Sequence, residues 1–333
     1  MDTTLALPLL IALIAVALAF DFLNGLHDAA NSIATVVTTK TLTPVQAVLF
    51  AAFFNFAAYW VFGLKVAETI GKGIMDKDVI TPSVVFGALI GAMFWNVLTW
   101  WKGIPSSSSH ALIGGLIGAG VSHAGLDGVV WAGVIKTAVF IFLSPMIGLA
   151  MSMLVVLITT WSFKSATPRS ADTVFKPLHI LSAAAYSLGH GSNDAQKTMG
   201  IITVLLYSQG YLGGEFHVPG WVVLSCYLAI SLGTLSGGWK IIETMGSRIT
   251  KLSQHQGFCA STGGSIMLFA ATAFGIPVST THTITGCIVG VGAAKRASAV
   301  RWGVASRVLV AWVLTMPAAA IVGAAFYWLT QIF

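Results

Sequence analysis

Apolar segments long enough to enter a membrane follow one another along the whole chain, separated by short polar stretches. A helix needs about twenty apolar residues to cross a bilayer, and the first segment, at 5–22, approaches that length. We therefore predict an all-α polytopic membrane protein with two units of five hydrophobic segments. The others lie at about 45–63, 83–101, 106–120, 129–160, 178–207, 221–238, 258–274, 278–293 and 303–331.

The two units share motifs at fixed spacings. Gly25 and Asp28 recur as Gly191 and Asp194, 166 positions later, and Pro145 recurs as a second proline 172 positions later. A chain with such a duplication is typical of transporters built from repeats. We divide it into a first repeat (1–163), a short linker (164–177) and a second repeat (178–333).

A polar motif interrupts the first segment of each unit at 21–31 and at 190–197. Asp28, Asp194 and Lys197 lie inside these motifs, and each costs roughly 2.5–3.5 kcal/mol on membrane-insertion scales. We expect these residues to face a cavity and the two helices to be broken there. A buried ion pair between Asp194 and Lys197 that only ties helices together is the structural alternative. Asp21 is a weaker candidate, suited to an interface or to supporting the break, and Pro145 is expected to break or kink 129–160.

A second repeated motif, Gly-Ile-Pro followed by hydroxyl residues and His, stands at 103–110 and at 275–282. Proline suits the first turn of a helix, and the hydroxyl groups can cap the helix that follows. Free N–H groups and the positive end of the helix dipole then form an anion site. Two facing tips would hold one anion between them. The alternative is a pair of ordinary Ser/Thr turns between membrane helices. We expect re-entrant hairpins here, although two full spans would leave the loop charges unchanged.

Basic residues predict the orientation of the chain. The loops 161–177, 239–256 and 294–302 carry Lys and Arg, which favours the cytoplasmic side. The two termini and the loops 121–128 and 208–218 have none, so we expect them outside, whereas 64–81 fits less cleanly. An odd number of segments per unit gives the halves opposite orientations, as in secondary transporters with a site at the membrane midplane.

Composition supports a membrane protein and excludes other classes. Of the 333 residues, 56% are hydrophobic and 8% charged, against about 25% charged in soluble domains. The net charge of +6 arises in short loops and does not indicate nucleic-acid binding. The three cysteines show no paired spacing, so neither a disulfide framework nor a metal site is predicted. No cofactor is indicated.

These motifs together resemble the inorganic phosphate transporter (PiT) family over nearly the whole chain. The resemblance implies symport of orthophosphate, an inverted-repeat fold in the lipid bilayer, and a homodimer. It also implies that phosphate lies between the hairpin tips and the polar motifs. Carried over by position, the phosphate ligands are Ser106, Ser107, Ser108, Ser109, Ser279, Thr280 and Thr281, with Asn31, Asn193, Asp28 and Asp194 around them.

Two departures from the sodium-coupled members bear on the coupling ion. Those members resemble one another in having Asn-Asp in both polar motifs and Asn at the position of Lys197. This chain reads His27-Asp28 in the first motif and carries a fixed positive charge at Lys197, which is similar to the bacterial low-affinity, proton-coupled branch. We assign Lys197 to the phosphate site and Asp28, Asp194 and His27 to the coupling ion. Supporting roles are expected for Gly25, Gly191, Gln196, His110 and His282.

The resulting prediction is a phosphate:proton symporter of the bacterial inner membrane that works by alternating access. A sulfate permease of the same fold is the nearest alternative. Hydrogen phosphate has an O–H donor for an ionised carboxylate and sulfate has none, so two acidic residues favour phosphate. An intramembrane serine hydrolase using Ser106–Ser109 with His110 is disfavoured, since Ser and His adjacent on one turn are poorly placed as nucleophile and base. A passive anion channel would not need paired carboxylates. We therefore predict that the protein is not an enzyme.

Overall fold

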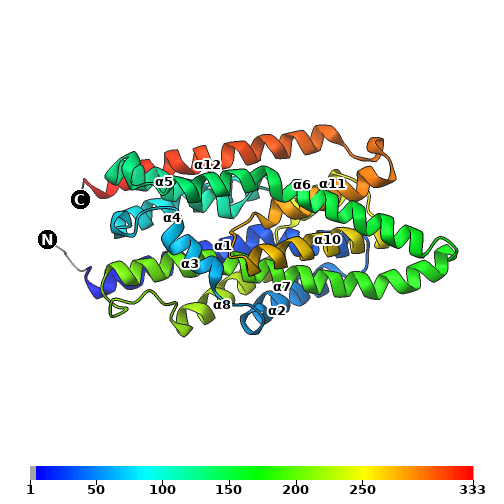
Figure 1. Ribbon diagram of the computed structural model, residues 1–333, viewed down its shortest axis with the longest axis horizontal. Helices are drawn as coiled ribbons and strands as arrows, with labels where there is room; N and C mark the ends of the chain where they lie inside the picture. The colour runs from blue at the N-terminus through cyan, green and yellow to red at the C-terminus, as the bar shows by residue number, and fades with distance from the viewer. Residues whose placement is uncertain (1–4, 333) are drawn as a thin grey trace.

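The structure, a computed structural model, describes residues 5–332, in which twelve α-helices and no β-strand are present (Figure 1). The prediction of an all-α protein is confirmed. The first six helices are α1 (Leu7–Thr38), α2 (Pro44–Ala57), α3 (Lys65–Gly73), α4 (Pro82–Lys102), α5 (Ser108–Ala124) and α6 (Trp131–Ser162). The second six are α7 (Pro168–Ser208), α8 (Gly220–Ser236), α9 (Trp239–Glu243), α10 (Gln254–Ala273), α11 (Thr280–Lys295) and α12 (Trp302–Thr330).

The first and the last helix of one set of six run opposite to their counterparts in the other set. In Figure 1, α1 begins and α12 ends at the same end of the molecule, whereas the connection between α6 and α7 lies at the other end. Helix α7 therefore runs against α1, and α12 runs against α6. Inverted units require this arrangement, and the division of the chain into repeats stays a prediction.

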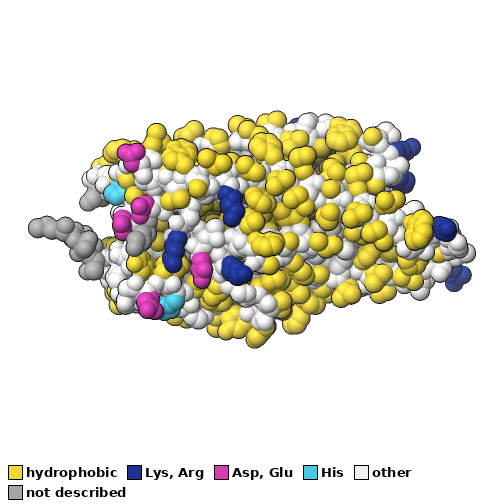
Figure 2. All heavy atoms as spheres, in the orientation of Figure 1, with side chains coloured by type: hydrophobic (Ala, Val, Ile, Leu, Met, Phe, Trp, Pro, Cys, Tyr) yellow, Lys and Arg dark blue, Asp and Glu magenta, His cyan; other side chains and the backbone are white. Residues whose placement is uncertain are grey.

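The molecule carries an apolar surface suited to a bilayer. Helices α1, α4, α6 and α12 are long and apolar enough to cross a membrane, and two bent pairs of helices pass the same test together. Hydrophobic side chains cover most of the face shown in Figure 2. Exposed residues such as Phe53, Phe142 and Leu157 would be costly in water. The chain is an integral membrane protein.

The helices are broken at other positions than the sequence predicted. Helices α1 and α7 run without interruption through the polar motifs, so the expected breaks at 21–31 and 190–197 are wrong. Helix α6 likewise continues through Pro145. The bends lie instead in the second segment of each half, where α2 and α3 form an angle of 83° and α8 and α9 one of 69°. Because neighbouring side chains satisfy the polar groups of α1 and α7, their backbone hydrogen bonds need not open.

Two hairpins, α4–α5 and α10–α11, turn inside the protein. Gly103 and Gly275 adopt φ angles of +67° and +65°, which glycine accepts without strain. Ser107 then caps α5 and Ser279 caps α11 by accepting the backbone N–H groups of the third residues along, at 3.2 and 3.1 Å. The hydroxyl side chains of both tips, at 106–109 and 279–281, are no more than 4% exposed. The predicted caps are confirmed, and each tip ends in the interior.

The short helices α3 and α9, which hydropathy did not predict, each hold the hairpin of the other half. Lys65 Nζ donates to the carbonyl oxygen of Ala273 at 3.1 Å, and Lys240 Nζ donates to that of Trp101, also at 3.1 Å. A lysine near the last carbonyl groups of a helix also suits the helix dipole. Hydroxyl groups repeat the pattern at 2.8 Å, from Thr69 to the Gly275 carbonyl and from Thr244 to the Gly103 carbonyl. The two halves are therefore interlocked.

Candidate oxyanion site

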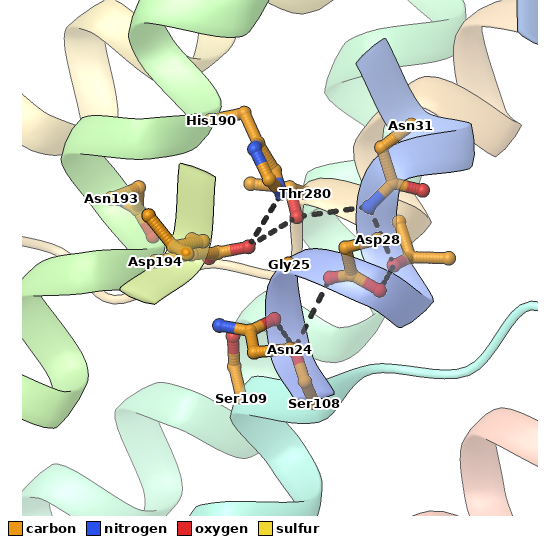
Figure 3. Close-up of polar contacts among 12 residues, drawn as sticks. Asn24, Gly25, Asp28, Asn31, Ser108, Ser109, His190, Asn193, Asp194 and Thr280 are labelled. Atoms are coloured by element: carbon orange, nitrogen blue, oxygen red, sulfur yellow. Dashed lines mark hydrogen bonds and ion pairs between the residues drawn. The ribbon is translucent and has the colours of Figure 1, made fainter. Parts of the chain in front are cut away.

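Four segments meet at one buried polar centre: α1, α7 and the tips of both hairpins (Figure 3). Residues spaced by three or four lie on one face of a helix. This spacing aligns Asn24, Asp28 and Asn31 on α1, and it aligns the equivalent residues His190, Asp194 and Lys197 on α7. All six side chains are no more than 2% exposed. The tips supply hydroxyl groups to both rows.

Asp28 is held by one histidine and by hydroxyl groups from both hairpins. His27 Nδ1 lies 2.6 Å from Asp28 Oδ1. Ser108 Oγ of the first tip donates to Oδ2 at 3.1 Å, and Thr281 Oγ1 of the second tip donates to Oδ1 at 3.4 Å. The carboxylate thus joins the two hairpins, and its nearest charged partner is a group that can lose its proton.

Asp194 is held by a permanent cation. Its Oδ1 forms an ion pair with Lys197 Nζ, one turn further along α7. Its Oδ2 accepts from Thr280 Oγ1 at 2.9 Å and lies 3.2 Å from His190 Nε2. The ion pair between Asp194 and Lys197, which the sequence analysis gave as the structural alternative, is therefore present in the structure.

Lys197 does more than pair with Asp194, because its ammonium group contacts both hairpin tips. Nζ donates to Ser109 Oγ of the first tip and to the Val278 carbonyl of the second, the latter at 2.8 Å. Asn31, the equivalent residue of α1, donates through Nδ2 to Thr280 Oγ1 and Thr281 Oγ1 at 3.2 and 2.9 Å. An ammonium group and an amide group therefore lie where the tips meet, both able to donate to an anion.

The seven hydroxyl residues predicted as phosphate ligands divide into two groups. Ser108, Ser109, Thr280 and Thr281 point toward the carboxylates, Asn31 and Lys197. The other three brace the hairpins. Ser107 and Ser279 serve as the helix caps, and Ser106 Oγ donates to Thr99 Oγ1 at 2.9 Å within its own hairpin. The first group is therefore the better set of candidate ligands for an oxyanion.

Several supporting residues also fix the hairpins or the bends. His27 Nε2 lies 3.0 Å from Thr99 Oγ1 of the first hairpin, and the equivalent Asn193 accepts at 3.3 Å from the N–H of Val278 in the second. Gln196 points away from the tips, and its Oε1 accepts the N–H groups of Val66 and Ala67 at the start of α3. It holds the bend between α2 and α3.

The two histidines that follow the tips pack against each other. The ring centroids of His110 and His282 are 4.8 Å apart, and His282 also stacks on Trp312 at 3.8 Å. Neither ring nitrogen of His110 has a hydrogen-bond partner within residues 5–332. These contacts give the pair a packing role beneath the tips.

Gly25 and Gly191 allow close contact between helices of the two halves. A Cβ atom on Gly25 would lie 2.0 Å from the carbonyl oxygen of Ile230, and one on Gly191 would lie 2.5 Å from that of Asn55. Any side chain at these positions would push α8 from α1 or α2 from α7. Their supporting role is therefore to bring the polar rows close to the tips.

Sequence reasoning missed three contributors. Asn24 Oδ1 accepts from Ser108 Oγ at 2.6 Å, Thr99 contacts His27, and His190 lies beside Asp194. Asn24 and His190 stand four residues before the two aspartates, and they are equivalent across the repeat. One helical turn plus the repeat spacing could have identified both, whereas Thr99 carries no such signal.

The centre has ligand atoms for one cation. Ligand atoms of Asp28, His190 and Asp194 all lie within 4.8 Å of one another, and all three side chains are buried. Two carboxylates and an imidazole can accept a proton or a monovalent ion. Chemically, the arrangement places donors for an oxyanion directly beside acceptors for a cation.

Comparisons with known proteins agree with this chemistry. The sequence profile described as "Phosphate transporter family" matches residues 24–323. The chain belongs to the phosphate transporter family. It is 64% identical over 327 residues to a protein of Rhizobium meliloti named "Probable low-affinity inorganic phosphate transporter", with 98% of both chains covered. A Bacillus subtilis protein of the same name is 43% identical over 336 residues, with both chains fully covered.

A solved structure named "The sodium-dependent phosphate transporter" superimposes with a TM-score of 0.91 at 26% identity. The match covers 98% of this chain and 100% of that one. Proteins of this family are transporters, so the hydrolase alternative is excluded.

Proposed function

We propose that this phosphate transporter imports orthophosphate together with protons by alternating access. The observation that carries the proposal is that the donors suited to phosphate are already engaged by carboxylates. Ser108 and Thr281 donate to Asp28, and Thr280 donates to Asp194. Phosphate and the carboxylates would therefore compete for the same hydroxyl groups.

This competition provides a physical basis for coupling. A buried carboxylate that loses its donors costs the full desolvation energy unless it gains a cation. Phosphate that takes over the hydroxyl groups thus favours cation binding at Asp28 and Asp194. By reciprocity, the bound cation strengthens phosphate binding. The proposed phosphate ligands are the four hydroxyl residues of the tips that face the carboxylates, together with Lys197 and Asn31.

Protons fit the charges of this site better than sodium. Lys197 already contacts Asp194, and a sodium ion beside the same carboxylate would face a fixed positive charge. Asp28 is paired with His27, and an imidazole can pass a proton to and from a neighbouring carboxylate. The solved neighbour is named for sodium dependence, so the two proteins would differ in coupling ion while sharing a fold.

We further propose a bacterial inner-membrane location with the basic end of the molecule in the cytoplasm. At the end of the molecule far from the chain termini, Lys and Arg are the charged side chains visible in Figure 2, whereas Asp and Glu gather near the termini. Positive residues favour the cytoplasmic side. Both termini would then lie outside, although residues 1–4 and 333 themselves fall outside the described part of the chain.

Uptake of radiolabelled phosphate into proteoliposomes tests the function. A proton gradient, inside alkaline, should drive accumulation above equilibrium, and a protonophore should abolish it. A sodium gradient of equal size without a pH difference should have no effect. Accumulation that follows sodium and ignores the protonophore would overturn proton coupling. Excess sulfate tests the nearest rival, since competition as strong as that of unlabelled phosphate would favour a general oxyanion permease.

A further inference from the structure

Asp21 is a fully buried carboxyl group outside the oxyanion site. It lies on α1, seven residues before Asp28, and its exposed fraction is 0%. Neither carboxyl oxygen makes a hydrogen bond of good geometry in the part of the chain that the structure describes, although the side chains of Thr198 and Asn24 lie beside it. Its neighbour Phe20 belongs to the larger apolar core. An ionised carboxylate in such a setting is so costly that the group takes up a proton instead.

The groups around Asp21 suit a neutral carboxyl. Thr198 of α7 and Asn24 of α1 lie beside it, and Cys226 and Tyr227 face it from α8. The hydroxyl groups of Thr198 and Tyr227 are buried and lack partners among residues 5–332. A protonated carboxyl can both donate and accept, as hydroxyl groups can. The charges of Asp194 and Lys197 of α7 act on it in opposite directions.

Packing alone does not call for an acid at this place in the fold. The equivalent residue of the second half is Ser187, 166 positions later, which is also fully buried. Its hydroxyl group donates to the Ala183 carbonyl of its own helix at 2.9 Å. A small side chain that satisfies itself locally is therefore sufficient for the helix contact. The carboxyl group of Asp21 therefore has no counterpart in the second half.

Asp21 is connected to the oxyanion site by a short row of side chains. Asn24 lies one turn along α1 on the same face, and its Oδ1 accepts from Ser108 Oγ at 2.6 Å. Ser108 Oγ lies 3.1 Å from Asp28 Oδ2. Figure 3 shows the Asn24 amide nitrogen turned away from Ser108, and the Asn24 side chain also lies beside Asp21. A change of charge on Asp21 thus acts on Asn24 and, through it, on Ser108.

We propose that Asp21 is a second proton-binding site of the transport cycle, separate from the phosphate site and linked to it through Asn24 and Ser108. The proposal rests on the proton coupling proposed above. Because Asp21 is closed on all sides here, its proton is exchanged only when α1 separates from α7 and α8. If that exchange faces one side of the membrane in one state and the other side in another, the proton crosses together with the substrate.

Infrared spectroscopy of the purified protein tests the protonation without any transport assay. The wild type should show a carboxylic-acid C=O stretching band that disappears in Asp21→Asn and shifts in Asp21→Glu. Ser187→Ala, the matched variant of the other half, should leave the band unchanged. If Asp21→Asn does not fold, the shift in Asp21→Glu decides the question. A spectrum that neither substitution changes would overturn the proposal.

The proton:phosphate ratio in proteoliposomes tests the role in transport. Asp21→Asn should retain phosphate exchange at equal pH and lower the ratio by about one proton per phosphate. Asp21→Glu should restore it, whereas a merely structural role would leave the ratio unchanged in both. An unchanged ratio in Asp21→Asn would overturn the proposal. Failure of the proposed function is distinguishable, because the wild type would then follow sodium while the infrared band still reported on Asp21.

Discussion

The two carboxylates at equivalent places in the two halves have different partners. Both lie beside a histidine, but Asp194 is also paired with Lys197, whose charge is permanent, whereas His27 is the only charged partner of Asp28 among the described residues. Both accept hydroxyl groups from the second tip, but only Asp28 also accepts one from the first. The two rows of equivalent residues therefore differ in one fixed charge, which Asp194 has beside it and Asp28 lacks.

This difference suggests separate tasks for the halves. A fixed cation beside a carboxylate favours its charged form. The proton taken up together with phosphate should therefore bind to Asp28 more readily than to Asp194, which lies beside Lys197. The four predictions below would break or sharpen this comparison, and they run from the largest expected effect to the smallest.

Removing the fixed cation should have the largest effect. Lys197→Ala leaves Asp194 buried without its charge partner, and breaking such a pair costs about 3–5 kcal/mol. We expect a marked fall in thermal stability in detergent and loss of phosphate uptake. Lys176→Ala, on an exposed part of the same helix, is the control. The double variant Asp194→Asn/Lys197→Asn should regain stability without uptake. A loss in Lys197→Ala no larger than in the control would contradict a stabilising role for this ion pair.

Neutralising Asp28 should uncouple phosphate transport from the proton gradient rather than unfold the protein. Asp28→Asn imitates the protonated acid in charge, so exchange of phosphate at equal pH should persist. Accumulation driven by a proton gradient should fall sharply, because the proton that Asp28 takes up together with phosphate is no longer carried. Radiolabelled uptake and exchange in the same proteoliposomes measure both. If the variant still accumulated phosphate with the wild-type proton:phosphate ratio, Asp28 would not be a coupling residue.

Changes at the tips should weaken binding by a moderate amount. Ser108→Ala and Thr281→Ala each remove a buried donor, which costs about 1–3 kcal/mol and corresponds to roughly 5- to 150-fold weaker phosphate binding. Calorimetric titration in detergent gives the affinity. The capping variants Ser107→Ala and Ser279→Ala should instead cost about 1 kcal/mol of stability. Equal loss of affinity in all four would show that capping, and not ligation, explains the first pair.

Removing the lysines that hold the hairpins should have the smallest effect on stability. The two variants should expose opposite sides of the protein. Lys65 and Lys240 are exposed, so each alanine variant should cost less than about 1 kcal/mol. Lys65→Ala releases the second hairpin and Lys240→Ala releases the first. In a protein without native cysteines, labelling of Ile276→Cys should rise from one side of the membrane and labelling of Ile104→Cys from the other. A rise from the same side in both would reject the inverted arrangement.

The sequence by itself determined the class, the family and the residue types of the site. Hydropathy and low charge are additive along a chain, so the membrane class could be read without coordinates. The repeated hydroxyl tips also specified their own caps, since a Ser at the N-cap and the N–H group it accepts are three residues apart. Asp28, Asp194 and Lys197 were identified because a charge inside an apolar segment is costly wherever the fold places it.

Only the tertiary structure decided where the helices break and which polar groups meet. The polar motifs of α1 and α7 stay helical because the tips, more than 70 residues distant in sequence, supply partners for their side chains. Helices α3 and α9 are too short for a hydropathy signal, and they exist because each one closes the hairpin of the opposite half. The pairing of Asp28 with hydroxyl groups of both tips joins residues 80 and 253 positions apart. Such contacts depend on the relative placement of two halves, which no local pattern encodes.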